Sequence, residues 1–350
     1  MAALSYAARF VAGEGGEHPP PAIPANVRDP ARNRCNIRDP ARNRRNVRVW
    51  SRNRRNIRLC RRNRRNIGVR RRNRRNIRGG GPAMIPRVLV IAGSDSGGGA
   101  GIQADVKTVA MLGGYATTAI TALTAQNTLG VQRVMPVPAE MVAAQVASVL
   151  ADIGADAVKI GMLGSAAVAH AVADALAAVP GLPLVFDPVM VATSGDALAD
   201  EGTVEAFDRL LRRATVVTPN LPELAALGGE AAVLARAAAL LVKGGHGEGA
   251  TLVDRLVTRE GEVARWEGAR IDTVHTHGTG CTLASAVAVG LAQGRGLAES
   301  VERARAFVRA AILAAPGLGR GHGPMGHHAV RLPPDSPRRS DAGAGEPAGE

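Results

Sequence analysis

Short apolar runs alternate with amphipathic stretches over residues 84–330. The apolar runs predict strands at 87–93, 115–126, 156–161, 182–187, 214–218 and 240–245, and the segments 251–258 and 262–268 fit an antiparallel hairpin. Apolar residues at helical spacing predict helices at 101–112, after Pro138, and at 165–178, 202–213, 279–292 and 297–314. Because strands and helices alternate, the pattern favours a three-layer α/β domain with helices on both faces of a mostly parallel sheet.

The segment before this domain is a decapeptide repeat rich in Arg and Asn. Asparagine recurs every ten residues from Asn26 to Asn76, and residues 26–78 hold 22 Arg against two Asp, a net charge of +20. No unit has enough apolar surface to bury, and like charges repel. We therefore predict disorder over residues 1–83, and also over the polar tail 331–350.

The repeat has two interpretations. One is a basic arm that binds nucleic acid through its phosphates. The other, which we favour, is a DNA repeat translated upstream of a true start at Met84. Residues 79–350 carry a net charge of −5, so the folded part itself is not expected to bind nucleic acid or an acidic membrane.

Composition excludes several other classes of protein. Three Cys among 350 residues cannot form a disulfide framework or a four-Cys zinc site. No apolar run reaches the ~18 residues of a membrane helix, and the first residues do not have the pattern of a secretory signal. Aromatic residues make up 2% of the chain, which argues against an RNA-stacking sheet. We expect the folded part to reside in the reducing cytoplasm.

The first glycine-rich loop, Gly93–Gly101, follows a predicted strand and opens a helix. Its spacing loosely matches a dinucleotide fingerprint. A dinucleotide site also needs an acidic residue about 20 residues further on, which binds the ribose. The corresponding region, 121–132, contains no Asp or Glu, and the next acidic residue is Glu140. This absence argues against hydride transfer. Asp105 lies one turn into the helix. It can accept a hydrogen bond from a ligand hydroxyl, or it can simply favour the helix start by its charge.

A second loop of small residues, His275–Thr282, precedes an apolar helix. The sequence has no G-x-x-x-x-G-K-[ST] motif, so phosphates need another site, and free N–H groups at a helix start provide one. Cys281 lies in the first helical turn, where the pKa of a thiol tends to fall, although a lone Cys can also be a small buried residue. His275 and His277, without further ligands, are not expected to form a metal site.

Two further strand ends carry polar side chains. Asn220 and Glu223 have the residue types and spacing of a helix capping box. Their oxygens also suit Mg²⁺, which keeps several of its waters when it binds protein. Lys243 ends another predicted strand, where it can pair with a phosphate or remain a solvated lysine.

Seven blocks in this order resemble the hydroxymethylpyrimidine/phosphomethylpyrimidine kinases of thiamine biosynthesis, in the ribokinase-like superfamily. They span about residues 91–285 and read AGSDSGGGAGIQADVKT, TAITALTAQNTLGVQ, VKIGML, FDPVMVATSGDAL, VTPNLPE, LVKGGH and HTHGTGCTLASA. No block falls in residues 1–83. The resemblance implies a kinase domain over 84–330 with a central sheet of about eight strands, ATP and Mg²⁺ as cofactors, and a homodimer.

The resemblance also implies roles for individual residues. A pyrimidine pocket would be lined by Gly98, Gly99, Gly101 and Asp105, with Gln126 on the aminopyrimidine edge and Met162 against the ring. Asn220 and Glu223 would organise Mg²⁺, and ATP would contact Lys243, Thr276 and His277. The anion hole would be formed by Gly278, Thr279 and Gly280. Cys281 stands where most sugar kinases of the superfamily carry an aspartate base.

The activity so implied is ATP-dependent phosphorylation of 4-amino-5-hydroxymethyl-2-methylpyrimidine to its monophosphate and then to its diphosphate. The nearest alternative is a pyridoxal kinase, since that family shares the fold, the glycine-rich loop and the G-T-G-C site. Gln126 favours the pyrimidine, because an amide can match a donor–acceptor edge with two hydrogen bonds.

Overall fold

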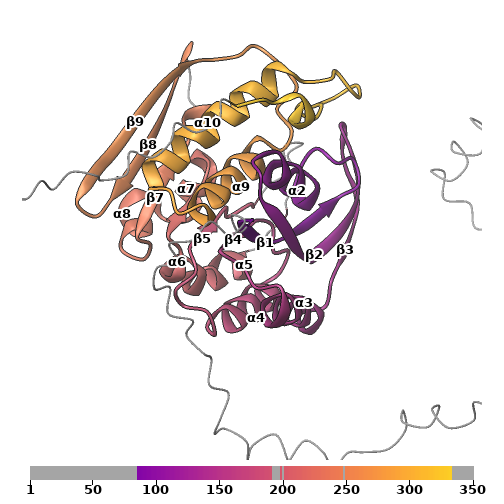
Figure 1. Ribbon diagram of the computed structural model, residues 1–350, viewed down its shortest axis with the longest axis vertical. Helices are drawn as coiled ribbons and strands as arrows, with labels where there is room; N and C mark the ends of the chain where they lie inside the picture. The colour runs from indigo at the N-terminus through magenta and orange to yellow at the C-terminus, as the bar shows by residue number, and fades with distance from the viewer. Residues whose placement is uncertain (1–84, 191–197, 199–200, 247–248, 333–350) are drawn as a thin grey trace, which may run out of the picture. The chain divides into compact units, whose positions relative to one another are not determined.

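A mixed β-sheet runs through the part of the chain that the structure describes. The structure is a computed structural model that describes residues 85–190, 198, 201–246 and 249–332. Its strand order is β3-β2-β1-β4-β5-β6-β7-β8-β9 (Figure 1). The strands are β1 (Arg87–Asp95), β2 (Tyr115–Asn127), β3 (Gly130–Pro136), β4 (Ala157–Ile160), β5 (Leu184–Phe186), β6 (Val216–Val217), β7 (Ala239–Val242), β8 (Thr251–Thr258) and β9 (Gly261–Ala269). Strands β2, β1, β4, β5, β6 and β7 pair in parallel, and β3, β8 and β9 are antiparallel. The predicted repeat of residues 1–83 and the tail beyond Leu332 lie outside the described residues.

The apolar run of β1 is buried on both faces of the sheet. Val88 and Val90 belong to one hydrophobic cluster, and Leu89 and Ile91 belong to the other. Successive side chains of a strand point to opposite faces, so an unbroken apolar run can pack against a layer of helices on each side of the sheet.

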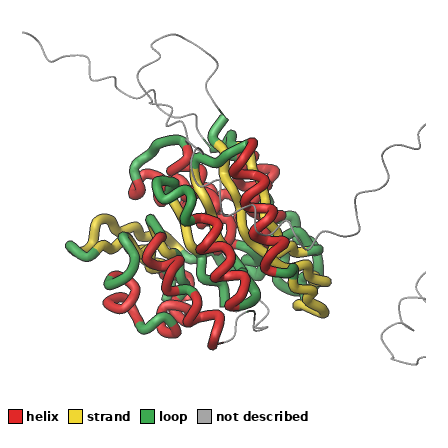
Figure 2. The backbone as a smooth tube through the Cα atoms, turned by 90° about the horizontal axis from the view of Figure 1, so that it is seen from below, coloured by secondary structure: helices red, strands yellow, loops and turns green. Residues whose placement is uncertain are grey.

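Helices form the two outer layers (Figures 1 and 2). One layer consists of α2 (Gly101–Met111), α9 (Thr279–Ala292) and α10 (Leu297–Leu313), whose buried apolar side chains belong to the same hydrophobic cluster as Val88. The other layer contributes apolar side chains to the hydrophobic cluster that contains Leu89. It consists of α3 (Ala139–Asp152), α4 (Ala166–Leu176), α5 (Glu201–Ala206), α6 (Asp208–Arg213), α7 (Leu221–Ala226) and α8 (Gly229–Leu234). The predicted three-layer α/β architecture is confirmed.

The structure differs from the prediction at β3 and at the predicted helix 202–213, and it also contains α8, which no predicted helix covers. The sheet has nine strands rather than about eight, because β3 pairs antiparallel with β2 at the sheet edge. Most of its side chains are exposed, so the strand lacks the buried apolar run that signals a strand in sequence. The predicted helix 202–213 divides into α5 and α6 at Phe207, whose ring is buried against Phe186 with ring centroids 5.1 Å apart.

Candidate active site

Parallel strands bring five polar or polarisable side chains to one edge of the sheet. Asp95, Met162, Asp187, Asn220 and Lys243 lie at or just beyond the carboxyl ends of β1, β4, β5, β6 and β7. All of them line one cavity of about 1350 Å³, larger than the usual pocket for a single small molecule. The cavity therefore has room for two ligands at the carboxyl edge, where α/β sheets bind them.

Most of the predicted site residues line this cavity, and three do not. The lining includes Gly101, Gln126, Met162, Asn220, Glu223, Lys243, Thr276, His277, Gly278, Thr279, Gly280 and Cys281. Gly98, Gly99 and Asp105 are not among the lining residues. Gly99 and Asp105 are buried, and Gly98 is half-buried.

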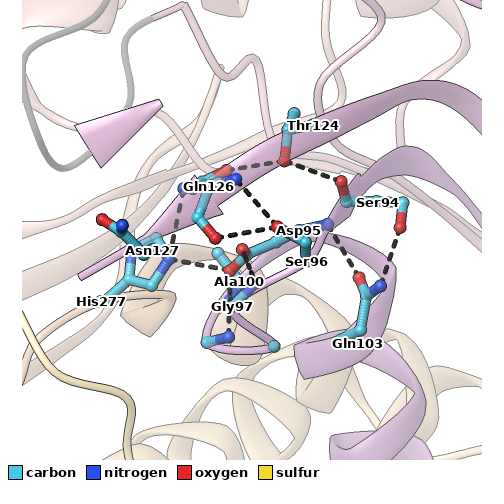
Figure 3. Close-up of polar contacts among 12 residues, drawn as sticks. Ser94, Asp95, Ser96, Gly97, Ala100, Gln103, Thr124, Gln126, Asn127 and His277 are labelled. Atoms are coloured by element: carbon cyan, nitrogen blue, oxygen red, sulfur yellow. Dashed lines mark hydrogen bonds and ion pairs between the residues drawn. The ribbon is translucent and has the colours of Figure 1, made fainter. Parts of the chain in front are cut away.

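The carboxylate of Asp95 organises the glycine-rich loop. Its Oδ1 accepts from the backbone N–H of Gly97 at 2.7 Å, and its Oδ2 accepts from those of Gly99 at 3.0 Å and Ala100 at 2.8 Å. The same Oδ2 lies 2.9 Å from Nε2 of His277 (Figure 3). Burial works to raise the pKa of Asp95, but the bonds from His277 and the backbone outweigh it and hold the pKa below its usual range. Asp95 is therefore ionised at neutral pH and ties the loop to His277.

The glycine-rich loop and the loop at the start of α9, here called the anion loop (Gly278–Cys281), are in close contact through glycine residues. Gly278 has a φ of +84° and precedes α9, and a side chain there would overlap the carbonyl oxygen of Gly99. A side chain on Gly99 would in turn overlap the imidazole of His277. Gly99 thus permits close contact between the two loops, and this explains its presence although it does not line the cavity.

Gln126 lies at an irregularity of β2, where the pairing register with β3 shifts between Ala125 and Gln126. The hydroxyl of Ser96 donates to the carbonyl oxygen of Gln126 and accepts from its N–H, both at 2.8 Å. This exchange fixes the backbone, and the amide lies between Thr124 and His277 (Figure 3). The structure thus places His277, which the resemblance assigned to ATP, beside Asp95 and the pyrimidine-side residue Gln126.

Asp105 forms a fully buried ion pair with Lys159 of β4. Each carboxylate oxygen lies 2.9 Å from Nζ, and the hydroxyl of Ser285 on α9 donates to the same carboxylate at 2.7 Å. Burial opposes the charge of Lys159, but Asp105 together with the other acidic groups nearby outweighs burial and holds the pKa of the ammonium above its usual value. With its oxygens engaged in this way, Asp105 links α2, β4 and α9 beneath the anion loop and does not face a ligand.

Cys281 lines the cavity, but its thiol differs from the expected one. Burial raises the pKa of Cys281 to about 11. The ammonium of Lys159 lowers it, whereas the carboxylates of Asp105 and Asp187 raise it further. The predicted fall of the thiol pKa at a helix start is therefore wrong, because burial and two nearby carboxylates exceed the effect of the helix end and Lys159. At neutral pH the thiol is protonated.

Asn220 and Glu223 form the capping box that their spacing indicated. Oδ1 of Asn220 accepts from the N–H of Glu223, and Oε2 of Glu223 accepts from the N–H of Asn220, both at 2.8 Å. Glu223 is 5% exposed. Its burial, together with the nearby carboxylate of Asp187, raises its pKa to about 7, even though Lys243 opposes the shift. The capping box therefore also holds a carboxylate in a locally negative environment.

Lys243 and Asp187 complete this charged group. Nζ of Lys243 lies 3.2 Å from Oδ1 of Asp187, which also accepts from the hydroxyl of Thr218 at 2.9 Å. A side chain on Gly280 would lie 3.5 Å from Nζ of Lys243 and 3.6 Å from Oδ2 of Asp187. The lysine and the aspartate thus adjoin the start of α9.

These residues fit Mg²⁺. Two neighbouring carboxylates, Asp187 and Glu223, share the lysine Lys243, which leaves negative charge that a cation would neutralise. Their oxygens, with the amide of Asn220, are the hard donors that Mg²⁺ prefers. Among the described residues no group of three or more His, Cys, Asp or Glu could hold a metal by itself. Mg²⁺ here would need ligands from water and phosphate, its usual way of binding at kinase sites.

Sequence reasoning did not single out Asp95, Asp187 or Lys159. Asp95 and Asp187 each follow the apolar residues of a strand at the carboxyl edge of the sheet. A carboxylate at that position indicates a functional residue, and this signal was present in the sequence. Lys159 interrupts the apolar strand β4, and a lysine at a fully buried strand position needs a partner. Its partner Asp105 is 54 residues away in sequence and became evident only in the fold.

An anion site at the start of α9, next to a lysine and a pair of carboxylates, is the arrangement of a kinase that phosphorylates small molecules. The fold is ribokinase-like. The chain is similar to the crystal structure of Bacillus subtilis pyridoxal kinase in complex with ADP, with a TM-score of 0.66 and 33% identity over 71% of this chain and 100% of that one. The chain belongs to the phosphomethylpyrimidine kinase family, whose model matches residues 95–326.

Curated relatives agree with this family. The chain is 49% identical to a hydroxymethylpyrimidine/phosphomethylpyrimidine kinase of Streptomyces coelicolor over 261 residues, which is 70% of this chain and 96% of that one. It is also 49% identical to a protein of the same description from Rhizobium meliloti, over 68% of this chain and 96% of that one. None of the helices among the described residues has both the length and the apolar character to cross a membrane.

Proposed function

We propose that this chain transfers the γ-phosphoryl group of ATP to 4-amino-5-hydroxymethyl-2-methylpyrimidine, and then phosphorylates the monophosphate to the diphosphate, for thiamine diphosphate biosynthesis. One observation carries the proposal. A single cavity holds Gln126, which suits an aminopyrimidine edge, together with the anion loop Gly278–Cys281 and Lys243, which suit phosphate. Acceptor and donor substrates can therefore meet in one site.

In the first step the hydroxymethyl oxygen forms a bond to the γ-phosphorus, and the bond from that phosphorus to the β–γ bridging oxygen breaks to release ADP. The backbone N–H groups at the start of α9 stabilise the charge on the transferring group, and Lys243 attracts the phosphates. Mg²⁺, when held by Asn220 and Glu223 with Asp187 nearby, supplies charge neutralisation to the phosphates.

The proton of the substrate hydroxyl passes to the thiolate of Cys281. A thiolate whose conjugate acid has a pKa of about 11 is a stronger base than an ordinary one, although it is less populated at neutral pH. The second step needs no such base, because its nucleophile is an anionic phosphate. The two phosphorylations therefore share the anion loop and Lys243 but differ in their need for Cys281.

A pyridoxal kinase is the alternative that a specific observation favours, since a pyridoxal kinase is among the structures with the same fold. A side-by-side kinase assay separates the two activities. We expect a higher kcat/KM for the hydroxymethylpyrimidine than for pyridoxal at the same concentrations of ATP and Mg²⁺. Faster turnover of pyridoxal would reject the pyrimidine assignment and support the alternative.

The remaining proposals concern the setting of the enzyme. We propose a cytoplasmic homodimer whose kinase domain begins at Met84, with residues 1–83 upstream of the true start. The intact mass of the natively expressed protein tests the start. A mass that begins at Met84 excludes nucleic-acid binding through residues 26–78. A mass that includes the repeat would leave that binding open, and salt-dependent binding with little sequence preference would then establish it. Light scattering of the same sample measures the oligomeric state.

A further inference from the structure

A buried ion pair lies next to Cys281 on the inner side of α9. Residues four apart in a helix face the same side, so Cys281 and Ser285 project toward the same neighbours. The hydroxyl of Ser285 donates to Asp105 at 2.7 Å, and both carboxylate oxygens of Asp105 lie 2.9 Å from Nζ of Lys159. Ser285, Asp105 and Lys159 are fully buried. The thiol of Cys281 therefore lies one helical turn from this group, on the face of α9 that packs against it.

The ammonium of Lys159 reaches toward the edge of the sheet that carries the cavity. A side chain on Gly161, which follows β4, would begin only 2.8 Å from Nζ. Gly161 thus leaves the space that the ammonium occupies, and the next residue, Met162, lines the cavity. Because Lys159 is fully buried, solvent does not screen its charge. A full positive charge is therefore held at the carboxyl end of β4.

Charged side chains from four parts of the fold act on the thiol of Cys281. Lys159 favours the thiolate and has the largest effect among the charged groups, whereas Asp105 on α2 and Asp187 after β5 oppose it. Lys243, which follows β7, interacts electrostatically with the same thiol. Burial also opposes the thiolate, so a thiolate at this position needs an opposite charge close by. Lys159 supplies the largest share of that charge.

We infer that Lys159 is a positioning residue of the reaction, whose buried ammonium stabilises the thiolate of Cys281 from beneath the anion loop. The inference rests on the proposed function, in which this thiolate takes the proton of the substrate hydroxyl. Lys159 is not among the residues that line the cavity, so it acts through Cys281 and not on a substrate. Its effect is therefore confined to the first of the two phosphorylations.

Asp105 and Lys159 act on the thiol with opposite signs, and this separates the inferred role from a structural one. Removing the lysine takes away the charge that favours the thiolate, whereas removing the aspartate takes away one that opposes it. Without Asp105, Lys159 still has Asp187 and Cys281 as acidic neighbours that favour its charge. Both substitutions break the same ion pair, so an ion pair that only stabilises the fold would make the two variants behave alike.

The experiment measures the rate at which iodoacetamide alkylates Cys281 in the full chain, at about pH 8, where only the small thiolate fraction reacts. Cys281 is half-buried and lines the cavity, so the reagent can reach it. Mass spectrometry of the peptide that contains Cys281 follows the reaction, and the peptides of Cys35 and Cys60 control for the activity of the reagent. The variants are Lys159→Met and Asp105→Asn, and circular dichroism checks that each is folded.

We expect Lys159→Met to slow the alkylation of Cys281 by about 3- to 30-fold, and Asp105→Asn to accelerate it by a similar factor. A nearby charge changes the thiolate population by about 10- to 1000-fold, and the accompanying change in nucleophilicity offsets about half of this on a logarithmic scale. A change in the same direction in both variants, or an unchanged rate in Lys159→Met, would overturn the inference.

A double variant covers the case in which Lys159→Met does not fold. Asp105→Leu combined with Lys159→Met leaves no unpaired charge at this site, and apolar replacements of a buried ion pair are often neutral or stabilising. Because the effect of the lysine on the thiol exceeds that of the aspartate, alkylation of the double variant should still be slower than that of the wild type. A rate at or above the wild-type rate would overturn the inference.

The two acceptor substrates test the role of Lys159 in the reaction. Lys159→Met should lower kcat/KM of the first phosphorylation by about 3- to 30-fold more than that of the second, since only the first step uses the thiolate. An equal loss on both steps would overturn the role of Lys159 in proton transfer. A wild type that phosphorylates neither the hydroxymethylpyrimidine nor its monophosphate would instead overturn the proposed function, and the alkylation rates would still test the effect of Lys159 on the thiol.

Discussion

Replacing Cys281 by serine separates the two phosphorylation steps. The substitution keeps a small polar side chain at the start of α9 and leaves the backbone N–H groups of the anion loop in place. It removes the thiolate that is proposed to take the proton of the substrate hydroxyl. Only the first step uses that proton transfer, so the second step serves as an internal control for folding and for phosphate binding.

The size of the effect follows from the environment of the thiol. Burial raises the pKa of Cys281 to about 11, so at about pH 8 roughly one thiol in a thousand is ionised. A serine hydroxyl is much harder still to ionise. A positioned base contributes about 10²–10⁴ in rate, and Cys281→Ser should slow the first phosphorylation by that factor and the second by much less.

The assay is steady-state formation of ADP with each acceptor substrate on one preparation of the variant. The wild type adds a pH test with a definite sign. The active base is the deprotonated form, so below a pKa of about 11 the first step should accelerate about tenfold per pH unit. The second step should not show this dependence. Equal losses on both substrates, or a first step that is flat with pH, would refute the role of Cys281 as base.

The remaining predictions concern the substrate edge, the carboxylate and the buried ion pair. Gln126→Ala should raise the KM for the pyrimidine about tenfold with little change in the KM for ATP, as initial rates would show, and an unchanged pyrimidine KM would remove Gln126 from the pocket. Glu223→Gln should lower kcat and raise the Mg²⁺ concentration for half-maximal rate in a metal titration, whereas a loss of stability alone would leave Glu223 only its capping role. Because the pKa of Glu223 is about 7 in the folded chain against 4.5 for an ordinary glutamate, the folded state loses stability as pH rises between these values. As pH rises over this interval, the Tm of the wild type should therefore fall relative to the Tm of Glu223→Gln. A constant difference between the two Tm values would contradict the raised pKa of Glu223. Lys159→Met should lower the free energy of unfolding in urea by about 3–5 kcal/mol, because it leaves Asp105 buried and unpaired, and a wild-type value would contradict the ion pair.

The architecture could be predicted because its signals are local. The apolar run of β1 and the helical spacing of α3 each reflect burial that neighbouring residues in sequence share. The capping box of Asn220 and Glu223 is likewise a contact over three residues, and the structure contains it. The two loops and the polar strand ends that the sequence analysis singled out line one cavity, because parallel strands must end at one edge of the sheet.

What could not be predicted depends on contacts across the fold. Asp105 is bound by Lys159 of β4 and by Ser285 of α9. The carboxylate that was expected to contact a ligand is therefore neutralised by the protein itself. The pKa of Cys281 was misjudged for the same reason, since the helix end was visible in sequence and the burial and nearby carboxylates were not. β3 was missed because an exposed edge strand has no buried run to reveal it.

We propose that one cavity performs two successive phosphorylations of an aminopyrimidine. The most direct measurement follows the products over time by phosphorus NMR, with the purified chain, ATP, Mg²⁺ and 4-amino-5-hydroxymethyl-2-methylpyrimidine. We predict that the monophosphate appears first, and that it is then consumed as the diphosphate forms. Absence of both products would contradict the assignment of the substrate, and a monophosphate that is never converted would contradict the second step.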